Sequence, residues 1–183
     1  MIRWFDVVFA ALGLILGAPV LLLIYILGLM DTGVPLFRQV RVGRYQQPFT
    51  LVKFRTMRVD TVSVASHLAS SSSITKLGRF LRKTKLDELP QLWNVLKGEM
   101  SLVGPRPNLF NQEELISERA ARGVYDVRPG ITGIAQVNDI DMSTPRLLAE
   151  TDALMLRDLR LSLYFKLLLQ TLLGKGRGDR VVR

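Results

Sequence analysis

A long apolar run near the N-terminus limits most strongly what this chain can fold into. It reads VVFAALGLILGAPVLLLIYILGLM, occupies residues 7–30, and contains no charged residue. As a helix it would extend about 36 Å, long enough to cross the hydrocarbon layer of a bilayer. A helix buried in a soluble core rarely has that length without polar relief, and no small-residue cleavage site follows, as one would after a signal peptide. The run therefore predicts a membrane-embedded segment.

Pro19 divides this run near its middle. Proline removes one backbone donor and clashes with the preceding turn, so a kinked helix is expected there, with halves too short to span a bilayer alone. The residues leave two arrangements open: a kinked spanning helix, or a helix that enters one leaflet, bends and returns. The positive-inside rule places Arg38, Arg41 and Arg44 in the cytoplasm, and Arg3 resists translocation, which favours re-entry.

The rest of the chain is strongly basic. Its 183 residues carry a formal net charge of +9, so an anionic partner is expected: nucleic acid, an anionic membrane surface or a phosphorylated substrate. There is no cysteine, which excludes disulfides and thiolate metal sites. The length fits one domain with an appendage. We expect a membrane segment at residues 1–31 and a cytoplasmic interfacial domain at residues 32–183.

The pattern after the apolar run predicts an α+β fold that is mainly helical. Alternating apolar residues at 35–57 indicate a small β-hairpin. Basic amphipathic stretches at 74–83 and 159–183 are typical of helices that lie at a lipid interface. Asn108 is expected to cap a helix that ends at Gly123, and Thr144-Pro145 to start another. We assign no role to His67, which lies in a serine-rich segment.

Two adjacent carboxylates, Asp87 and Glu88, stand in the sequence KLDELPQ. Neighbouring helical residues point about 100° apart, so the pair cannot act as the opposed carboxylates of a glycosidase. One interpretation is helix capping, with Asp87 as N-cap and Pro90 in the first turn. The other is chemical: an aspartate can attack phosphorus and form an acyl phosphate, provided that cations offset the charge of its target.

Several cations occur where they could supply that help. Arg106 lies between two prolines in GPRP, Arg128 precedes the Pro-Gly turn of DVRPG, and Lys53 and Arg55 belong to KFRTM. Prolines fix φ on both sides of Arg106 and so hold its guanidinium for bidentate phosphate binding. These residues, set around Asp87 and Glu88, predict a site for phosphates and a divalent cation.

The same stretches resemble a known family. In order, FRQVRVG, KFRTM, LGRFLRKTKLDELPQLWNVLKGEMSLVGPRP and DVRPGITGIAQVN are similar to the small monotopic phosphoglycosyl transferases, bacterial enzymes that start glycan assembly on a polyprenyl phosphate. The resemblance covers nearly the whole chain. It implies Mg²⁺-dependent transfer of a sugar 1-phosphate from a UDP-sugar to undecaprenyl phosphate, with release of UMP. It also implies a location on the cytoplasmic face of the bacterial inner membrane.

Residue by residue, the resemblance makes Asp87 the nucleophile that carries the phosphosugar, and also a metal contact. Glu88 assists, and Arg106 binds phosphate. The family has a re-entrant membrane helix bent at a Ser-Pro pair, which corresponds here to Ala18-Pro19 and favours re-entry further. We therefore expect a covalent aspartyl phosphosugar intermediate and a hinge at Ala18 and Pro19.

The chain departs from the family pattern at several positions. The hinge has Ala18 in place of serine, so one hydroxyl that could satisfy the bent backbone is missing. After AQVN, relatives continue Gly-Arg, whereas this chain has Asp139-Ile140. In relatives, tyrosines are common after the aspartate that corresponds to Asp152, whereas this chain has Leu154 and Met155. The last two departures lie where sugar or nucleotide preference could be set, so no sugar is predicted.

A second class of function is a membrane-tethered basic module that binds nucleic acid or anionic lipid, with Asp87 only a cap. It predicts strongly salt-dependent binding without a need for Mg²⁺. The arginines, however, stand beside prolines in turns and not along one open stripe interleaved with aromatic residues. The favoured partners are therefore a UDP-sugar, undecaprenyl phosphate and anionic lipids, and not nucleic acid. A third possibility, a membrane scaffold, gives no reason for GPRP or the acidic pair.

Overall fold

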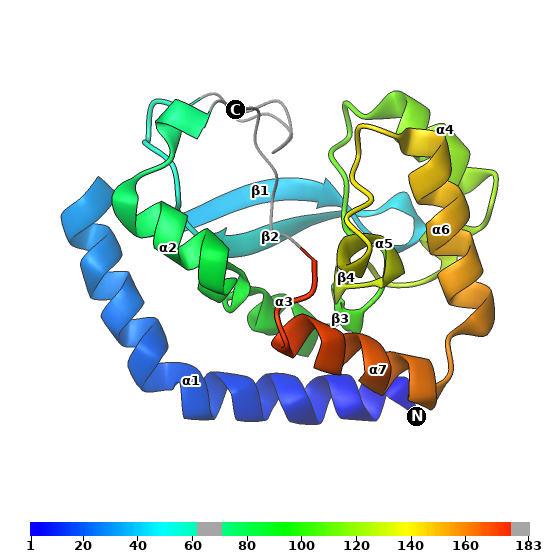
Figure 1. The fold of residues 1–183 in the computed structure, drawn as a ribbon, viewed down its shortest axis with the longest axis horizontal. Coiled ribbons are helices and arrows are strands. Elements are labelled where there is room, and N and C mark those ends of the chain that lie inside the picture. Colours follow the sequence, from blue (N-terminus) through cyan, green and yellow to red (C-terminus); the bar gives the residue numbers. More distant parts are fainter. Residues whose placement is uncertain (62–70, 177–183) are drawn as a thin grey trace.

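The computed structural model describes residues 1–61 and 71–176. His67 and the end of the basic C-terminal stretch lie outside these residues. The fold is α+β and mainly helical, as predicted, with one long helix set against a hairpin, a second small sheet and several shorter helices (Figure 1).

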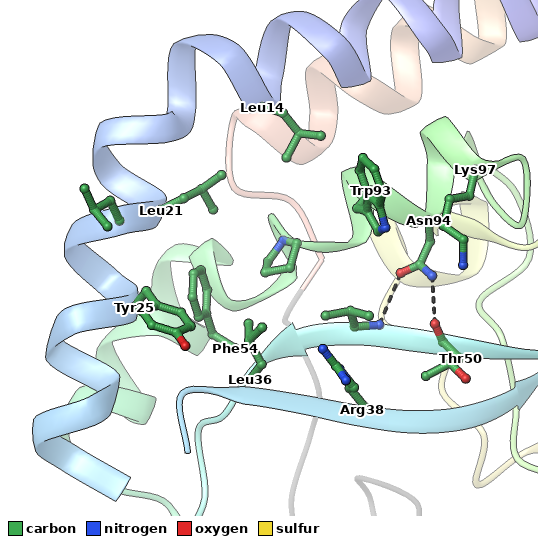
Figure 2. Close-up of a pocket in the computed structure, with 13 residues that line it drawn as sticks. Leu14, Leu21, Tyr25, Leu36, Arg38, Thr50, Phe54, Trp93, Asn94 and Lys97 are labelled. Carbon is green, nitrogen blue, oxygen red and sulfur yellow. Dashed lines mark hydrogen bonds between the residues drawn. The ribbon is translucent and has the colours of Figure 1, made fainter. Parts of the chain in front are cut away.

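Helix α1 (Ile2–Thr32) contains the whole apolar run. Within the described part of the chain it is the one helix long and apolar enough to cross a membrane. It bends into two arms (Figure 1), and Leu14 and Leu21 lie on either side of the bend (Figure 2). Pro19 lies inside the helix, so the predicted kink is present. Apolar side chains around the bend are exposed: Leu16 is 76% exposed and Leu22 is 61% exposed.

Both arms of α1 pack against the rest of the chain at their outer ends. In the first arm, Asp6 is buried. Its Oδ2 accepts a hydrogen bond from Ser101 Oγ at 2.9 Å, and its Oδ1 accepts one from the Leu102 N–H at 2.9 Å. Tyr164 Oη donates to the same carboxyl group at 2.9 Å. In the second arm, buried Ile24 packs in a cluster with Phe54. The residues near the bend are thus the part of α1 that stands away from the domain.

The predicted hairpin is formed by β1 (Leu36–Val42) and β2 (Pro48–Phe54), which pair antiparallel. A short 3₁₀ turn, η1 (Arg44–Gln46), joins them. Side chains alternate between the two faces of a strand, and partners in register share a face. Arg38 opposite Val52 therefore lies on one face of the hairpin, and Arg41 opposite Phe49 lies on the other.

A second sheet was not predicted. Strands β3 (Ser101–Val103) and β4 (Gly130–Thr132) form a short parallel pair. Its close approach depends on Gly130, because a Cβ there would lie 2.0 Å from the backbone nitrogen of Gly104. This pairing sets the GPRP and RPG segments side by side.

Some of the remaining helices match predicted segments, whereas α5 and the 3₁₀ turns were not predicted. These helices and turns are α2 (Lys76–Thr84), η3 (Ser71–Ser73), η4 (Leu86–Glu88), α3 (Gln91–Lys97), α4 (Glu113–Ala120), η5 (Val124–Asp126), α5 (Ile134–Val137), α6 (Pro145–Asp158) and α7 (Leu161–Leu172). Helix α6 begins at Thr144-Pro145, as predicted. Asn108, however, does not cap α4, whose N-cap is Gln112, and α4 ends at Ala120, before Gly123. Asn108 is fully buried and serves a different network, described below.

Candidate active site

The two neighbouring carboxylates lie in a tight turn between α2 and α3. Lys85 ends α2 in the left-handed conformation, with φ 59°, and η4 follows directly with Asp87 and Glu88. Asp87 is only 4% exposed. The N-cap of α3 is Pro90, without a side-chain capping bond, so the interpretation of Asp87 as the cap of this helix is wrong. The buried carboxylate of Asp87 therefore still needs another explanation.

Glu88 and Arg106 connect this turn to the GPRP segment. Arg106 Nη2 lies 2.9 Å from Glu88 Oε1, and both side chains are largely covered. Because a half-buried arginine with a carboxylate partner keeps its other guanidinium donors in a fixed direction, Arg106 can offer them to a further anion. The structure thus brings Arg106 next to the acidic pair, as the sequence predicted.

Beside this pair is a small hollow lined by three cations, Arg41, Lys53 and Arg106, together with Leu51, Gln91, Pro107 and Gly130. Arg41 and Lys53 are each only 7% exposed. They come from the same face of the hairpin, and η4 packs against β2. Three positive charges around one hollow favour a ligand with more than one negative charge.

Arg41 was not among the predicted site residues. Its Nη1 donates to the Pro107 carbonyl at 3.1 Å, and its Nη2 to Gln39 Oε1 at 2.6 Å. The signal that could have found it is strand alternation, since Arg41 and Gln39 share a face of β1. Sequence reasoning used Arg41 only as one of several charges that orient the membrane segment.

A buried network holds the Arg106 backbone in place. Arg119, 1% exposed, pairs with Asp152 at 2.6 Å and donates from Nη1 to the Arg106 carbonyl at 2.8 Å. The same Nη1 donates to Asn108 Oδ1 at 2.9 Å, which also accepts from Tyr125 Oη at 2.9 Å. This network spans α4, α6, η5 and the GPRP segment, so the position of Arg106 is fixed from behind by tertiary contacts.

Two predicted phosphate ligands do not line the hollow. Arg55 donates from Nε to the Val34 carbonyl at 3.0 Å, and its guanidinium lies 5.4 Å from the Phe37 ring. Lys53 also approaches that ring, at 5.7 Å, so Arg55 is a neighbour of the hollow. Arg128 donates from Nε to the Gly98 carbonyl at 2.7 Å, at the end of α3. Phosphate binding by Arg55 and Arg128 stays a prediction.

Lys85 and Asp139 are further charged residues near the acidic turn. Burial lowers the pKa of Lys85, and Arg106 acts in the same direction, whereas Glu88 and Asp139 raise it. Lys85 Nζ donates to the Lys175 carbonyl at 2.5 Å. Asp139 has φ 60°, in the left-handed region that favours glycine.

The donor set near Asp87 suits Mg²⁺ only in combination with a substrate. No group of three or more metal-ligating side chains occurs in the described parts of the chain. Magnesium, however, is commonly held by one or two carboxylates together with substrate phosphate oxygens. Asp87 offers that arrangement, because it precedes Glu88, whose partner Arg106 lines the cationic hollow. The residues present therefore fit a metal that arrives with a diphosphate.

Comparison with known proteins decides the family. The bacterial sugar transferase family matches residues 1–175. The chain belongs to this family. Among relatives, it is 47% identical to the UDP-glucose:undecaprenyl-phosphate glucose-1-phosphate transferase of Caulobacter vibrioides, over 75% of this chain and 54% of the relative.

Two other relatives show the same likeness. The chain is 45% identical to the uncharacterized sugar transferase EpsL of Bacillus subtilis, over 74% of this chain and 67% of the relative. It is 37% identical to the undecaprenyl-phosphate galactose phosphotransferase of Salmonella typhimurium, over 78% of this chain and 34% of the relative. The matched part thus spans about one third to two thirds of the length of these relatives.

Proposed function

We propose that this sugar transferase moves a sugar 1-phosphate from a UDP-sugar to undecaprenyl phosphate and releases UMP. The observation that carries the proposal is the hollow lined by Arg41, Lys53 and Arg106, which the Glu88–Arg106 ion pair joins to the turn that holds the buried Asp87. Family membership and two relatives that are named for transfer to undecaprenyl phosphate support the same reaction. The product would be the lipid-linked sugar that begins assembly of a glycan.

In the first step, an Asp87 carboxylate oxygen attacks the phosphorus that bears the sugar. A new oxygen–phosphorus bond forms, and the bond from that phosphorus to the oxygen bridging it to the α-phosphate breaks. That oxygen leaves with the α-phosphate as UMP. Asp87 then carries the phosphosugar as an acyl phosphate.

The basic residues offset the repulsion between the Asp87 carboxylate and the negatively charged diphosphate that it attacks. Arg41, Lys53 and Arg106 stabilise the negative charge of the diphosphate and of the departing UMP. Glu88 keeps Arg106 oriented through their ion pair. Because these cations are fixed by backbone and side-chain contacts before substrate binds, little reorganisation is needed during the reaction.

In the second step, a phosphate oxygen of undecaprenyl phosphate attacks the phosphorus held on Asp87. A diphosphate bond forms to the lipid, the Asp87–phosphorus bond breaks, and the free carboxylate is restored. Mg²⁺, held by Asp87 with assistance from Glu88, would neutralise charge on the phosphoryl oxygens. Arg55 and Arg128 would contribute to substrate binding from the edge of the site.

We also propose that α1 is re-entrant and that the site lies on the cytoplasmic face of the bacterial inner membrane. Support comes from Asp6 in the first arm and Ile24 in the second, which are both buried against the same domain. A helix with both arms fastened to one domain can place its bend in the bilayer, but its ends would then stay on one side. Ala18 and Pro19 would form the hinge at the deepest point.

The direct test is UMP release from a panel of UDP-sugars by the full chain in lipid nanodiscs with Mg²⁺. Each reaction is run with and without undecaprenyl phosphate, on the wild type, Asp87→Asn and the exposed control Asp60→Asn. We expect sustained UMP release only with the lipid acceptor, reduced in Asp87→Asn by at least about a thousandfold. Asp60→Asn should match the wild type.

The same assay can refute each part of the proposal. Equal UMP release by Asp87→Asn would exclude Asp87 as the nucleophile. Absence of UMP release across a broad panel of UDP-sugars, with the acceptor present, would contradict the reaction itself. Replacing Mg²⁺ with a chelator should stop the wild-type reaction, and undiminished turnover would contradict the metal requirement.

A further inference from the structure

A groove lies between the two arms of α1 and the hairpin, on the opposite side of the hairpin from the cationic hollow. Figure 2 shows it between Leu14 and Tyr25 of α1, Phe54 and Arg38 of the hairpin, and Trp93 of α3. Its volume is about 600 Å³. That volume lies in the range of sites that bind small molecules and cofactors. None of the catalytic roles above uses it.

The chemistry of the lining changes from one end of this groove to the other. Along α1 and the adjoining end of the hairpin it is aliphatic and aromatic, with Leu14, Leu21 and Phe54. At the hairpin and α3 it presents Arg38 and Trp93, both exposed, the latter 56% exposed. A lining that combines apolar side chains with an amphipathic aromatic side chain and a cation suits the acyl chain, glycerol and phosphate of a phospholipid.

The charges around the groove favour an anionic headgroup. No aspartate or glutamate is among the lining residues, and Arg38 has no hydrogen-bond or ion-pair partner within residues 1–61 and 71–176. Lys97, the other cation of the lining, already pairs with Glu99 at 2.6 Å. A zwitterionic lipid would bring an ammonium group with no acidic residue of the lining to receive it. The net charge of the groove is therefore best matched by a lipid with a net negative charge.

Strand alternation separates this groove from the chemistry at Asp87. Arg38 and Val52 lie on the face that lines the groove, whereas Arg41 and Lys53 lie on the opposite face, toward the cationic hollow. A lipid whose phosphate rests on Arg38 is thus divided from Arg106 by the hairpin. This arrangement favours a lipid of the bilayer over the lipid substrate as the occupant.

We propose that the groove binds one anionic phospholipid of the bilayer, with an acyl chain against Leu14, Leu21 and Phe54 and the phosphodiester on Arg38. The lipid would fill the space between the two arms of α1 and so fasten the bend to the domain. This proposal rests on the membrane association proposed above. It does not depend on the identity of the reaction.

The test is native mass spectrometry of the full chain, released from detergent micelles that contain equal amounts of phosphatidylglycerol and phosphatidylcholine. The wild type should retain one phosphatidylglycerol, several-fold in preference to phosphatidylcholine. Arg38→Gln should abolish this preference, and Val52→Trp, which fills the groove, should abolish retention. Arg58→Gln, an exposed cation outside the groove, and Val40→Trp, on the same hairpin face outside the lining, are the matched controls.

Several outcomes would overturn the proposal. One is equal retention of the two lipids by the wild type, and another is unchanged preference in Arg38→Gln, which alters only the headgroup contact. Mole-for-mole displacement of phosphatidylglycerol by added undecaprenyl phosphate would instead make the groove an acceptor site. UMP release is measured on the same samples: turnover without lipid retention refutes only the groove, and retention without turnover refutes only the enzyme proposal.

Discussion

Arg119 donates a hydrogen bond to the main-chain carbonyl of Arg106, at 2.8 Å, while its own charge is balanced by Asp152. A buried ion pair between α4 and α6 thus supports the segment whose side chain meets Glu88. The two prolines around Arg106 restrict its backbone, and Arg119 adds the tertiary contact that sets where this backbone lies. Rigid placement of the cation therefore has both a local and a long-range cause.

The first prediction follows from that buried pair. Arg119→Met leaves the Asp152 carboxylate buried without its partner and should lower the free energy of unfolding by about 3–5 kcal/mol. The double variant Arg119→Met/Asp152→Leu should recover part of this loss, because no unpaired charge remains, although the Arg106 carbonyl still lacks its donor. Chemical denaturation in detergent measures both. The exposed Arg146→Met serves as control, and a loss in Arg119→Met no larger than in that control would contradict the assigned role.

The second prediction concerns the anchor of the first arm of α1. Tyr164→Phe removes a buried donor to Asp6 and should cost about 1–3 kcal/mol of stability. Tyr45→Phe makes the same chemical change at an exposed tyrosine and should have little effect. Denaturation of the two variants side by side is the measurement. Equal stability of the two would show that the Tyr164–Asp6 bond does not hold the arm.

The third prediction is a pH dependence that originates at Lys85. Burial lowers the pKa of Lys85 below its ordinary value of 10.5, so the unfolded chain binds this proton more readily than the folded chain. Stability therefore rises with pH through the window between the lowered pKa and 10.5, and this rise is lost in Lys85→Met. The Tm of the variant relative to wild type should fall as pH approaches 10.5. The control is Lys83→Met. A Tm of Lys85→Met that stays constant or rises relative to wild type over this pH range, after correction for the control, would be inconsistent with this assignment.

The fourth prediction tests the re-entrant arrangement of α1. The chain has no cysteine, so Ile2→Cys introduces a single thiol near the N-terminus. In a re-entrant protein this thiol should react with a membrane-impermeant maleimide only after the inner membrane is permeabilised, as should the domain control Ser143→Cys. Labelling of Ile2→Cys in intact spheroplasts, with Ser143→Cys protected, would instead establish a spanning helix.

Local signals in the sequence predicted much of this fold. The hairpin follows from alternation on either side of Gly43, and the start of α6 from Thr144-Pro145, because turn and cap chemistry act over a few residues. The β3–β4 pair was not predictable in this way, since its strands are three residues long and their approach depends on Gly104 meeting Gly130.

The site was predictable where a motif carried it and not where tertiary packing did. Asp87, Glu88 and Arg106 belong to one motif, and the Glu88–Arg106 pair unites its two ends. Arg41 and Arg119 reach the same region from distant elements, Arg41 from the hairpin and Arg119 from α4. The capping interpretation of Asp87 was wrong because a separate 3₁₀ turn precedes α3 and Pro90 takes the cap position.

The central claim is that Asp87 carries the phosphosugar. The most direct measurement is mass spectrometry of the intact protein and its peptides after mixing with the active UDP-sugar and Mg²⁺ in the absence of undecaprenyl phosphate. We predict a mass increase of one sugar phosphate on the peptide that contains Asp87, lost when the acceptor is added and absent in Asp87→Asn. Attachment at another residue, or turnover by Asp87→Asn without any adduct, would contradict the account.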